Sequence, residues 1–195
     1  MFRTLRPALT LFIGLTLLTG LAYPLLVTGI AQLAFPWRAN GSVLAVNGTP
    51  VGSSLIGQDF SAPGVFWGRP SATIPQPDNG LASGGSNLGP TNPAQIAAVK
   101  ANVDALRAAD PGNEAPIPVD LVTASGSGLD PDISLAAAEY QLDRVARARH
   151  MRPQAVQRLL DAHAVHPFLG LFGEPRVNVL ELNLALDGSV PRRLR

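Results

Sequence analysis

The sequence predicts a single membrane-spanning helix near the N-terminus, followed by an extracytoplasmic domain of mixed α and β structure. Residues 7–37 contain no charged side chain. About 20 apolar residues suffice to cross the ~30 Å hydrocarbon layer, and a crossing segment of this length has to be helical. Residues 38–187 alternate between strand-like and helix-like patterns separated by turn residues, and they are enough to bury one core.

The charges beside the apolar run predict its orientation. Arg3 and Arg6 precede the run, and only Arg38 follows it closely. Basic residues near a membrane span are retained on the cytoplasmic side. We therefore expect a single-pass membrane protein with residues 1–6 in the cytoplasm and the following domain outside.

A cleaved signal peptide is the alternative interpretation of the same run. Its charged start would be residues 1–6, its apolar core Pro7–Leu21, and its cleavage site Gly20-Leu21-Ala22. We favour a retained helix because apolar sequence continues as far as Phe35, which a signal peptide does not need. The next three residues, Pro36-Trp37-Arg38, have the composition of an interfacial anchor.

Two features inside the run predict local behaviour. Pro24 lacks a backbone donor, so we expect a kink in the helix there. Thr10 with Gly14, and Thr16 with Gly20, have the small-residue spacing that lets another helix approach closely. This spacing also occurs often by chance.

Composition excludes several kinds of site. The chain contains no cysteine, which excludes disulfides, thiolate zinc sites and cysteine nucleophiles. Its net charge is +1 with no basic stripe, and only 6% of its residues are aromatic, so nucleic acid is not an expected partner.

The first elements expected after the apolar run are a β-hairpin and a long loop. Residues 42–46 and 49–56 flank Asn47-Gly48, the residue pair that best tolerates the positive φ angles of a two-residue turn. Residues 61–93 are rich in Gly, Pro and small polar residues. A loop of this length is usually functional or held against another part of the molecule.

Asn92-Pro93 predicts a helix start, with Asn as the cap and Pro at the first position, and Asp110-Pro111-Gly112 predicts its end. Residues 118–123 are expected to form a short buried strand, residues 124–129 a flexible loop, and Asp130-Pro131 the start of the next helix. The apolar stripe expected on the first of these helices is Ile96, Val99, Val103 and Leu106.

The remaining elements follow from periodicity. In the helix after Asp130-Pro131, apolar residues are expected to face inward and the arginines outward; Pro153 begins a further helix. Strands are expected at residues 168–172 and 177–179, and Asn178 is expected to cap a helix over residues 179–186. Residues 188–195 form a basic tail that we expect to be frayed. The inward set is Leu135, Ala138, Leu142 and Val145, and the outward set Arg144, Arg147 and Arg149.

The glycine-rich loops at residues 84–86 and 126–128 do not match known nucleotide motifs. A P-loop needs Lys directly after its last Gly, but the only lysine is Lys100. A dinucleotide loop needs a third Gly where Pro131 stands, and a serine nucleophile elbow needs Gly where Ser125 stands.

No other cluster predicts chemistry, so we expect no catalytic and no metal-binding residue. Asp130 and Asp132 have the composition of a cation site or an acid/base pair, but two carboxylates at a helix N-terminus are the simpler interpretation. His150, His163 and His166 lack the spacing of a helical zinc pair, and His163 is expected to pack in the core. The arginines from Arg144 to Arg158 are expected to form a solvated face.

Several long blocks of the sequence nevertheless form a recognisable set. They are Tyr23-Pro24-Leu25-Leu26-Val27-Thr28-Gly29, residues 52–58, Phe66-Trp67-Gly68-Arg69-Pro70-Ser71, residues 83–90, residues 119–131 and residues 173–179. In these blocks, over nearly the whole chain and in the expected order, the sequence resembles the C subunit of the Kdp-type potassium-transporting ATPase (KdpC). This resemblance implies a location in a bacterial-type inner membrane.

The resemblance implies a non-catalytic accessory subunit of a high-affinity, ATP-driven potassium uptake complex. Its implied partners are a channel-like potassium-translocating subunit, a P-type subunit that hydrolyses ATP, and the lipid bilayer, with ATP and potassium handled by the partner subunits. The implied role is assembly and stabilisation of the complex. The residues expected to contact partners are Tyr23, Pro24, Gly29, Trp67, Arg69, Asn87 and Asp120.

The family is also proposed to raise the ATP affinity of the complex as a catalytic chaperone, and Ser83-Gly84-Gly85-Ser86 is likened to a nucleotide-associated signature loop. The predicted orientation places this loop outside the cell, whereas ATP is cytoplasmic, so any effect on ATP affinity has to be indirect. Two alternatives from other classes are an anchored or secreted serine hydrolase, using Ser127 or Ser86 with His163 or His166, and a free extracytoplasmic binding module.

Overall fold

The computed structural model describes residues 2–167, 170 and 173–194. The chain forms two compact units: Met1–Val43 together with Arg193–Arg195, and Leu44–Arg192. Each unit is described by itself. The strand expected at residues 168–172 lies outside the described residues, apart from Gly170, which is in a turn.

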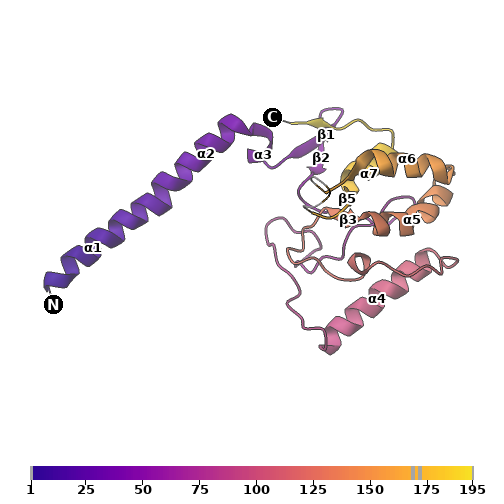
Figure 1. Ribbon diagram of the computed structural model, residues 1–195, viewed down its shortest axis with the longest axis horizontal. Helices are drawn as coiled ribbons and strands as arrows, with labels where there is room; N and C mark the ends of the chain where they lie inside the picture. The colour runs from indigo at the N-terminus through magenta and orange to yellow at the C-terminus, as the bar shows by residue number, and fades with distance from the viewer. Residues whose placement is uncertain (1, 168–169, 171–172, 195) are drawn as a thin grey trace. The chain divides into compact units, whose positions relative to one another are not determined.

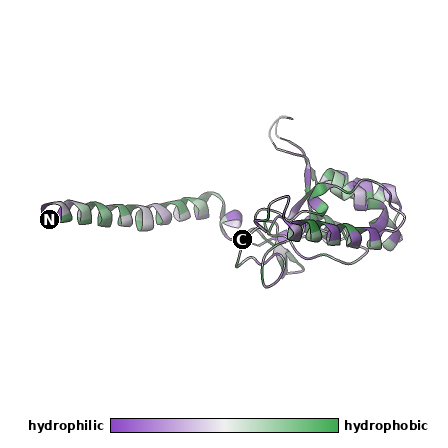
Figure 2. Cartoon of the chain, turned by 90° about the horizontal axis from the view of Figure 1, so that it is seen from below, coloured by the Kyte–Doolittle hydropathy of each residue, from purple (hydrophilic) through white to green (hydrophobic). Residues whose placement is uncertain are grey.

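The first unit is dominated by one continuous helical segment. It consists of α1 (Phe2–Leu17), a π-helical turn η1 (Leu18–Ala22) and α2 (Tyr23–Ala34). Among the described residues, Arg3–Ala34 is the one helix long and apolar enough to cross a membrane, by length and composition, and none of its apolar window is buried in the protein. Hydrophobic residues recur along this helical segment (Figure 2).

The π-helical turn is the local response to Pro24. Proline has no N–H to donate to the carbonyl four residues earlier. One residue before it, the Tyr23 N–H donates to the Leu18 carbonyl oxygen five residues back. A π-turn of this kind is one of the recognised causes of helix bending. The sequence located the irregularity but not its form.

A short helix α3 (Pro36–Ala39) follows, and Trp37 connects it to the end of the chain. The Trp37 Nε1–H donates to the Val43 carbonyl oxygen over 3.2 Å. The Arg193 guanidinium lies 4.3 Å from the centre of the Trp37 ring, and the Leu194 N–H donates to the same Val43 oxygen. The expectation of a frayed tail was therefore wrong, because Arg192–Arg193 forms strand β6.

The expected hairpin is confirmed as β1 (Val43–Val46) and β2 (Thr49–Ser53), although its second strand ends before Ile56. Asn47 and Gly48 have φ angles of 52° and 83°, as a type I′ turn requires. The strand order β2-β1-β6 places β1 in the middle of this sheet.

Three predicted helices are confirmed. Helix α4 (Pro93–Ala109) is capped by the Asn92 side chain, which accepts from the Ala94 N–H over 2.9 Å. Helix α7 (Val179–Leu186) is capped by Asn178 in the same way, and α6 (Pro153–His163) begins at its proline. The apolar stripe of α4 is only partly confirmed, because Leu106 is buried whereas Ile96 is 57% exposed.

Two predicted elements around Asp130 were wrong. Residues 119–121 form a short 3₁₀ turn, η2, and not a strand. Helix α5 (Leu135–Ala148) begins after Ser134, whose hydroxyl accepts from the Ala137 N–H. The residues before it, Asp132–Ser134, form strand β3, since they pair antiparallel with β5 (Arg176–Asn178).

The second sheet and three helices hold the core of the second unit. Strand β5 lies between β3 and β4 (Ala164–Val165). Helix α6 contacts both α5 and α7, and all three helices contact this sheet (Figure 1). Helix α4 adds Leu106 to the same core. The largest fully buried apolar side chains are Phe66, Ile133, Leu160, Leu182, Val145, Val156 and Val177.

Arg144 is buried and fastens the long loop to helix α5. Its side chain was expected to face solvent, but the residue is only 4% exposed. Its guanidinium donates to the Pro63 and Val65 carbonyl oxygens over 2.6 and 3.1 Å. It also lies 4.7 Å from the centre of the Trp67 ring. Burial lowers the pKa of Arg144 to about 10, so the group stays charged at neutral pH.

Two buried amides bind the main chain of the same loop. The Asn183 side chain accepts from the Phe66 N–H over 2.8 Å and donates to the Phe66 oxygen over 3.0 Å. Gln141 forms the equivalent pair with Trp67, over 2.8 and 3.1 Å. Buried backbone groups need hydrogen-bond partners. These side chains supply the hydrogen bonds that a neighbouring strand would otherwise make to residues 66–67.

The other arginines of the run are divided between pairing and solvent. Arg149 is bonded to the Gly64 oxygen and pairs with Asp187 over 2.7 Å, and Arg147 pairs with the buried Asp110. Arg158 is exposed, as expected. The interpretation as a single solvated face was therefore wrong for Arg144 and Arg149.

The substitution Arg144→Gln is expected to lower the free energy of unfolding by about 2–4 kcal/mol, because it leaves buried carbonyls of the loop without donors. Thermal and denaturant unfolding of the full chain in detergent, followed by tryptophan fluorescence, measures this. Arg158→Gln removes the same charge from an exposed position and is the matched control, expected within about 0.5 kcal/mol of wild type. Equal stabilities for the two variants would contradict the assignment.

Candidate functional site

The two glycine-rich loops, far apart in sequence, lie against each other. The Gly84 N–H donates to the Ser127 carbonyl oxygen over 2.8 Å. The Ser83 hydroxyl donates to the same oxygen over 3.0 Å. We call residues 69–73, 83–86 and 125–130 the glycine-loop junction, and it is the candidate functional site.

The absence of side chains makes this contact possible. A methyl group added at Gly85 would lie 2.8 Å from the Gly126 oxygen, and one at Gly128 would lie 2.5 Å from the Gly84 oxygen. Gly128 also has a φ of +67°, which favours glycine. A methyl group at Gly84 would meet nothing within 4 Å. The junction is therefore closed on one side and open at Gly84.

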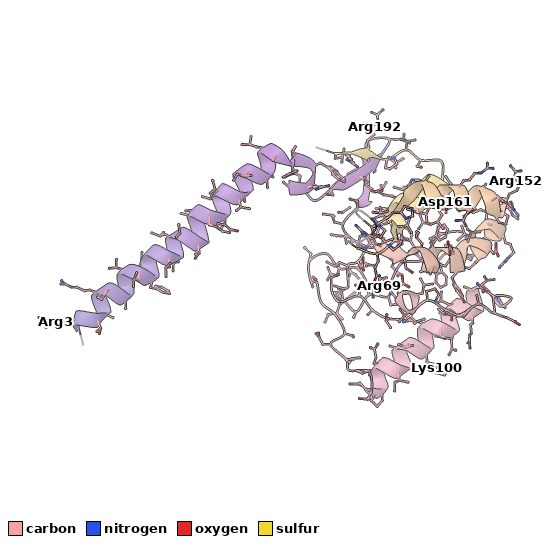
Figure 3. The ribbon with its side chains drawn as sticks, in the orientation of Figure 1. Arg3, Arg69, Lys100, Arg152, Asp161 and Arg192 are labelled. Atoms are coloured by element: carbon pink, nitrogen blue, oxygen red, sulfur yellow. The ribbon has the colours of Figure 1, made fainter. Side chains whose placement is uncertain are left out.

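Two polar residues of the segment before these loops, Ser71 and Arg69, bind the second glycine-rich loop. The Ser71 hydroxyl donates to the Gly128 oxygen over 2.7 Å. Arg69 pairs with Asp130 over 3.1 Å, and both side chains are about a third exposed or less. Figure 3 shows Arg69 among these loops. The junction is thus a small surface in which loops are fixed by one another and not by a sheet.

A cavity of about 300 Å³ adjoins Arg69 and includes Asp59 and Asp78 in its lining. Burial, and the nearby charge of Asp59, raise the pKa of Asp78 from 3.8 to about 6. Since the folded state holds this proton more tightly than the unfolded chain, Asp78 makes stability fall between pH 3.8 and about 6 as pH rises. Carboxyls of this kind are common in functional sites and in structural networks alike.

The loop likened to a nucleotide-binding signature already uses one of its backbone N–H groups inside the protein. Phosphate loops present several unpaired N–H groups to the ligand. Here the Gly84 N–H is bonded to Ser127, and Gly85 faces a carbonyl oxygen. Within the described residues, no group of three or more His, Asp or Glu residues is placed to hold a metal ion.

The residues expected to contact partners fall into three groups. Tyr23, Pro24 and Gly29 are exposed on the membrane-length helix of the first unit. Asn87 is exposed in the loop of the second unit, with a φ of 52°. The third group has roles inside the second unit, and its members are Trp67 beside Arg144, Arg69 bonded to Asp130, and Asp120, which accepts from the Ser134 N–H over 2.8 Å.

The polar residues considered for catalysis are used locally. Asp130 pairs with Arg69, and Asp132 pairs with Arg176 over 2.8 Å. The expectation that both lie at a helix N-terminus was wrong, because α5 begins only at Leu135. The Ser127 hydroxyl accepts from the Leu129 N–H. His163 Nδ1 lies 2.9 Å from the Leu159 oxygen, on a side chain that is only partly buried. Among the described residues, the structure does not join either candidate serine to a histidine.

Sequence reasoning missed the residues that hold the loops. Gln141 and Arg144 are three residues apart and therefore lie on one face of α5, and that face also carries the buried Ala137 and Val145. Two polar residues within an apolar stripe were therefore the one sign in the sequence that Gln141 and Arg144 are buried and bonded. Ser71 gave no signal, because nothing local indicates that its partner is Gly128.

Taken together, the chain combines one helix that is long and apolar enough to cross a membrane, by length and composition, with one loop-rich α/β unit, as expected of a small single-pass membrane protein. The family model described as KdpC, K⁺-transporting ATPase, c chain, matches residues 5–188. The chain therefore belongs to the KdpC family.

Individual relatives agree over nearly their full lengths. The chain is 64% identical over 187 residues to a protein from Methylibium petroleiphilum, which covers 96% of this chain and 98% of the relative. It is 65% identical over 187 residues to one from Polaromonas naphthalenivorans, with 96% and 95% covered. A protein from Variovorax paradoxus is 63% identical over 193 residues, with 99% and 100% covered. All three are named potassium-transporting ATPase KdpC subunit.

The closed side of the junction predicts a difference between its glycines. Gly128→Ala is expected to lower the free energy of unfolding by about 1–3 kcal/mol, through strain at positive φ and a clash with the Gly84 oxygen. Gly84→Ala is the matched control and is expected to change it by about 0.5 kcal/mol or less. Unfolding of the full chain in detergent measures both. A tolerated Gly128→Ala would show that the two loops are not in close contact.

Proposed function

We propose that the chain is the non-catalytic accessory subunit of a high-affinity, ATP-driven potassium uptake complex. In this proposal it assembles and stabilises a channel-like potassium-translocating subunit and a P-type subunit that hydrolyses ATP. Family membership supports a place in the K⁺-transporting ATPase. The observation that carries the accessory role is the glycine-loop junction, which is fixed internally and still leaves Gly84 open on its outer side.

The junction is suited to binding a protein surface. Rigid loops without regular structure lose little entropy on binding, because their conformation is already fixed. Beside Gly84, the same loop carries Leu81, which is 98% exposed, and Leu88, which is 38% exposed. Such apolar side chains next to a flat glycine surface favour close contact with a partner of complementary shape.

ATP and potassium are handled by the partner subunits in this proposal. The internal bond of the Gly84 N–H supports the absence of direct nucleotide contact at residues 83–86. The charge pattern supports it too, since Arg3 and Arg6 favour a cytoplasmic N-terminus and hence an extracytoplasmic junction. An influence on ATP affinity would then act through the partner subunits.

The membrane-length helix supplies the second proposed contact. Its apolar side chains are exposed, including Tyr23 at 63%, so they are not covered by the residues that the structure describes. Gly29 has no neighbour within 4 Å of an added methyl group, which leaves room for another helix to approach closely. We assign Tyr23, Pro24 and Gly29 to contacts with lipid and with the helices of the partner subunits.

Co-purification tests the proposed function. An N-terminally tagged chain, extracted from membranes that express the partner subunits, is expected to retain a channel-like protein and a P-type ATPase. Gly84→Trp is expected to reduce this recovery several-fold, because it places a bulky ring on the side of the junction where an added Cβ meets no atom within 4 Å. Gly112→Trp is the matched control, since Gly112 is equally open but lies in the turn after α4. Full recovery with Gly84→Trp would exclude the junction as the docking surface.

The proposed topology has its own test. The chain has no cysteine, so Ser61→Cys and Thr4→Cys each introduce a single thiol. Position 61 lies after the helix, and position 4 lies in its first turn, before the uncharged run of residues 7–37. In intact cells, a membrane-impermeant thiol reagent is expected to label the variant at position 61 and not the one at position 4, whereas both react after permeabilisation. The reverse pattern would place the junction in the cytoplasm and reopen direct nucleotide contact.

A further inference from the structure

The first unit carries an arginine stacked on a tryptophan directly beyond the end of its membrane-length helix. Helix α2 ends at Ala34, and Trp37 follows three residues later. The Arg193 guanidinium lies over the Trp37 ring at 4.3 Å. Both residues belong to the same compact unit. Arg193 therefore contacts a residue that closely follows the membrane-length helix.

We propose that Trp37, Arg38 and Arg193 form a binding site for the phosphate of an anionic phospholipid headgroup. The proposal rests on the proposed function only in that the helix spans the bilayer, which places this cluster at a membrane surface. It adds a ligand, because neither the family match nor the junction assigns a lipid to these residues. We call the three residues the interfacial arginine site.

The arginines of this site lack acidic partners. The first acidic residue of the whole sequence is Asp59, and none follows Asp187. Among the ion pairs of the described residues, none includes Arg38 or Arg193, and both side chains are exposed. A guanidinium has five N–H donors and no acceptor, so these groups need an anion or water.

Stacking prepares Arg193 for a phosphate. The central carbon of the guanidinium lies over the ring, 4.3 Å from its centre, so the ring fixes the position of the group. Arginine binds phosphate through two parallel N–H donors of this planar group. The ring is itself held in place, because the Trp37 Nε1–H donates to Val43 and the Leu194 N–H donates to the same oxygen.

The position selects a lipid over other anions. Tryptophan is enriched where the hydrocarbon of a bilayer meets its headgroups, and arginine near a helix end reaches the same depth. Each basic residue near an anionic membrane surface adds about 1 kcal/mol of attraction. A lipid phosphate is present there at high local concentration, whereas a free anion has to come from solution.

Quenching of Trp37 by brominated lipids tests the site in the full chain. The chain is reconstituted in phosphatidylcholine vesicles that contain a small fraction of either brominated phosphatidylglycerol or brominated phosphatidylcholine. The variant Trp37→Phe retains only Trp67. Its quenching is measured separately and subtracted from that of the wild type, which leaves the quenching of Trp37. Wild type is expected to be quenched more by the anionic lipid, which shows that this lipid is enriched beside Trp37.

Variants then assign the enrichment to Arg193. Arg193→Gln is expected to reduce it about fivefold, the change that corresponds to one basic residue at a membrane surface. Arg193→Lys keeps the charge but loses the stacked plane, and is expected to fall between Gln and wild type. Arg152→Gln is the matched control, because Arg152 is exposed at the start of α6, and it is expected to leave the enrichment unchanged.

Each of the other outcomes overturns the proposal in a distinguishable way. Equal quenching by the two lipids, or no effect of Arg193→Gln, would exclude the lipid site and leave the membrane helix intact. No quenching by either lipid would show that Trp37 is not at a bilayer surface, and would also overturn the proposed topology. Loss of enrichment in about 10 mM inorganic phosphate, but not in chloride at the same ionic strength, would identify a free-anion site in place of a lipid site.

Discussion

The second unit depends on a single buried cation. The segment from Ser61 to Asn92 has neither helix nor strand, so its backbone groups need partners from elsewhere. Arg144 supplies several donors at once to Pro63 and Val65. A buried charge is unfavourable unless it is well bonded, and carbonyl oxygens together with an aromatic ring meet that requirement without a carboxylate. The loop and the helix therefore stabilise each other.

The polar groups around Arg144 extend this principle along the chain. Gln141 donates to and accepts from Trp67, and Asn183 does the same with Phe66. The Gln141 oxygen also accepts from Arg144 over 2.7 Å. Connected networks of this kind are favourable only when every member is satisfied. The backbone of Phe66 and Trp67 is thus fixed by side chains of α5 and α7, just before the glycine-loop junction begins at Arg69.

The glycine-loop junction is built by the opposite means. There, the backbones of two loops are in direct contact, which is possible because glycines at the contact have no side chain. Gly85 and Gly128 are required by that approach, whereas Gly84 is not. The contact between the two loops therefore depends on Gly85 and Gly128, and a methyl group at Gly84 leaves it intact.

Local chemistry explains which elements could be predicted from the sequence. Asn92 and Asn178 cap helices through their own neighbours, and Asn47-Gly48 makes its turn unaided, so all three were correct. The errors involve distant partners. Asp130-Pro131 resembled a helix start, but pairing with residues 176–178 makes a strand of the residues that follow it.

The same reason applies to the candidate site. Its glycine-rich loops were recognisable in the sequence, but their contact joins residues more than 40 positions apart. Arg144 was assigned to solvent because its charge was judged alone, without the carbonyls 79 and 81 positions away that receive it. Loop segments with no periodicity carry no signal for such pairs.

The strand order β2-β1-β6 has a consequence for how the chain is made. Strand β1 is the first β-element to emerge during synthesis, and β6, its second neighbour, is nearly the last. Until translation reaches Arg192–Arg193, one edge of β1 has open hydrogen-bonding groups, and contacts so distant in sequence form late. The free edge of β1 is therefore closed only after residues 44–191 have been synthesised.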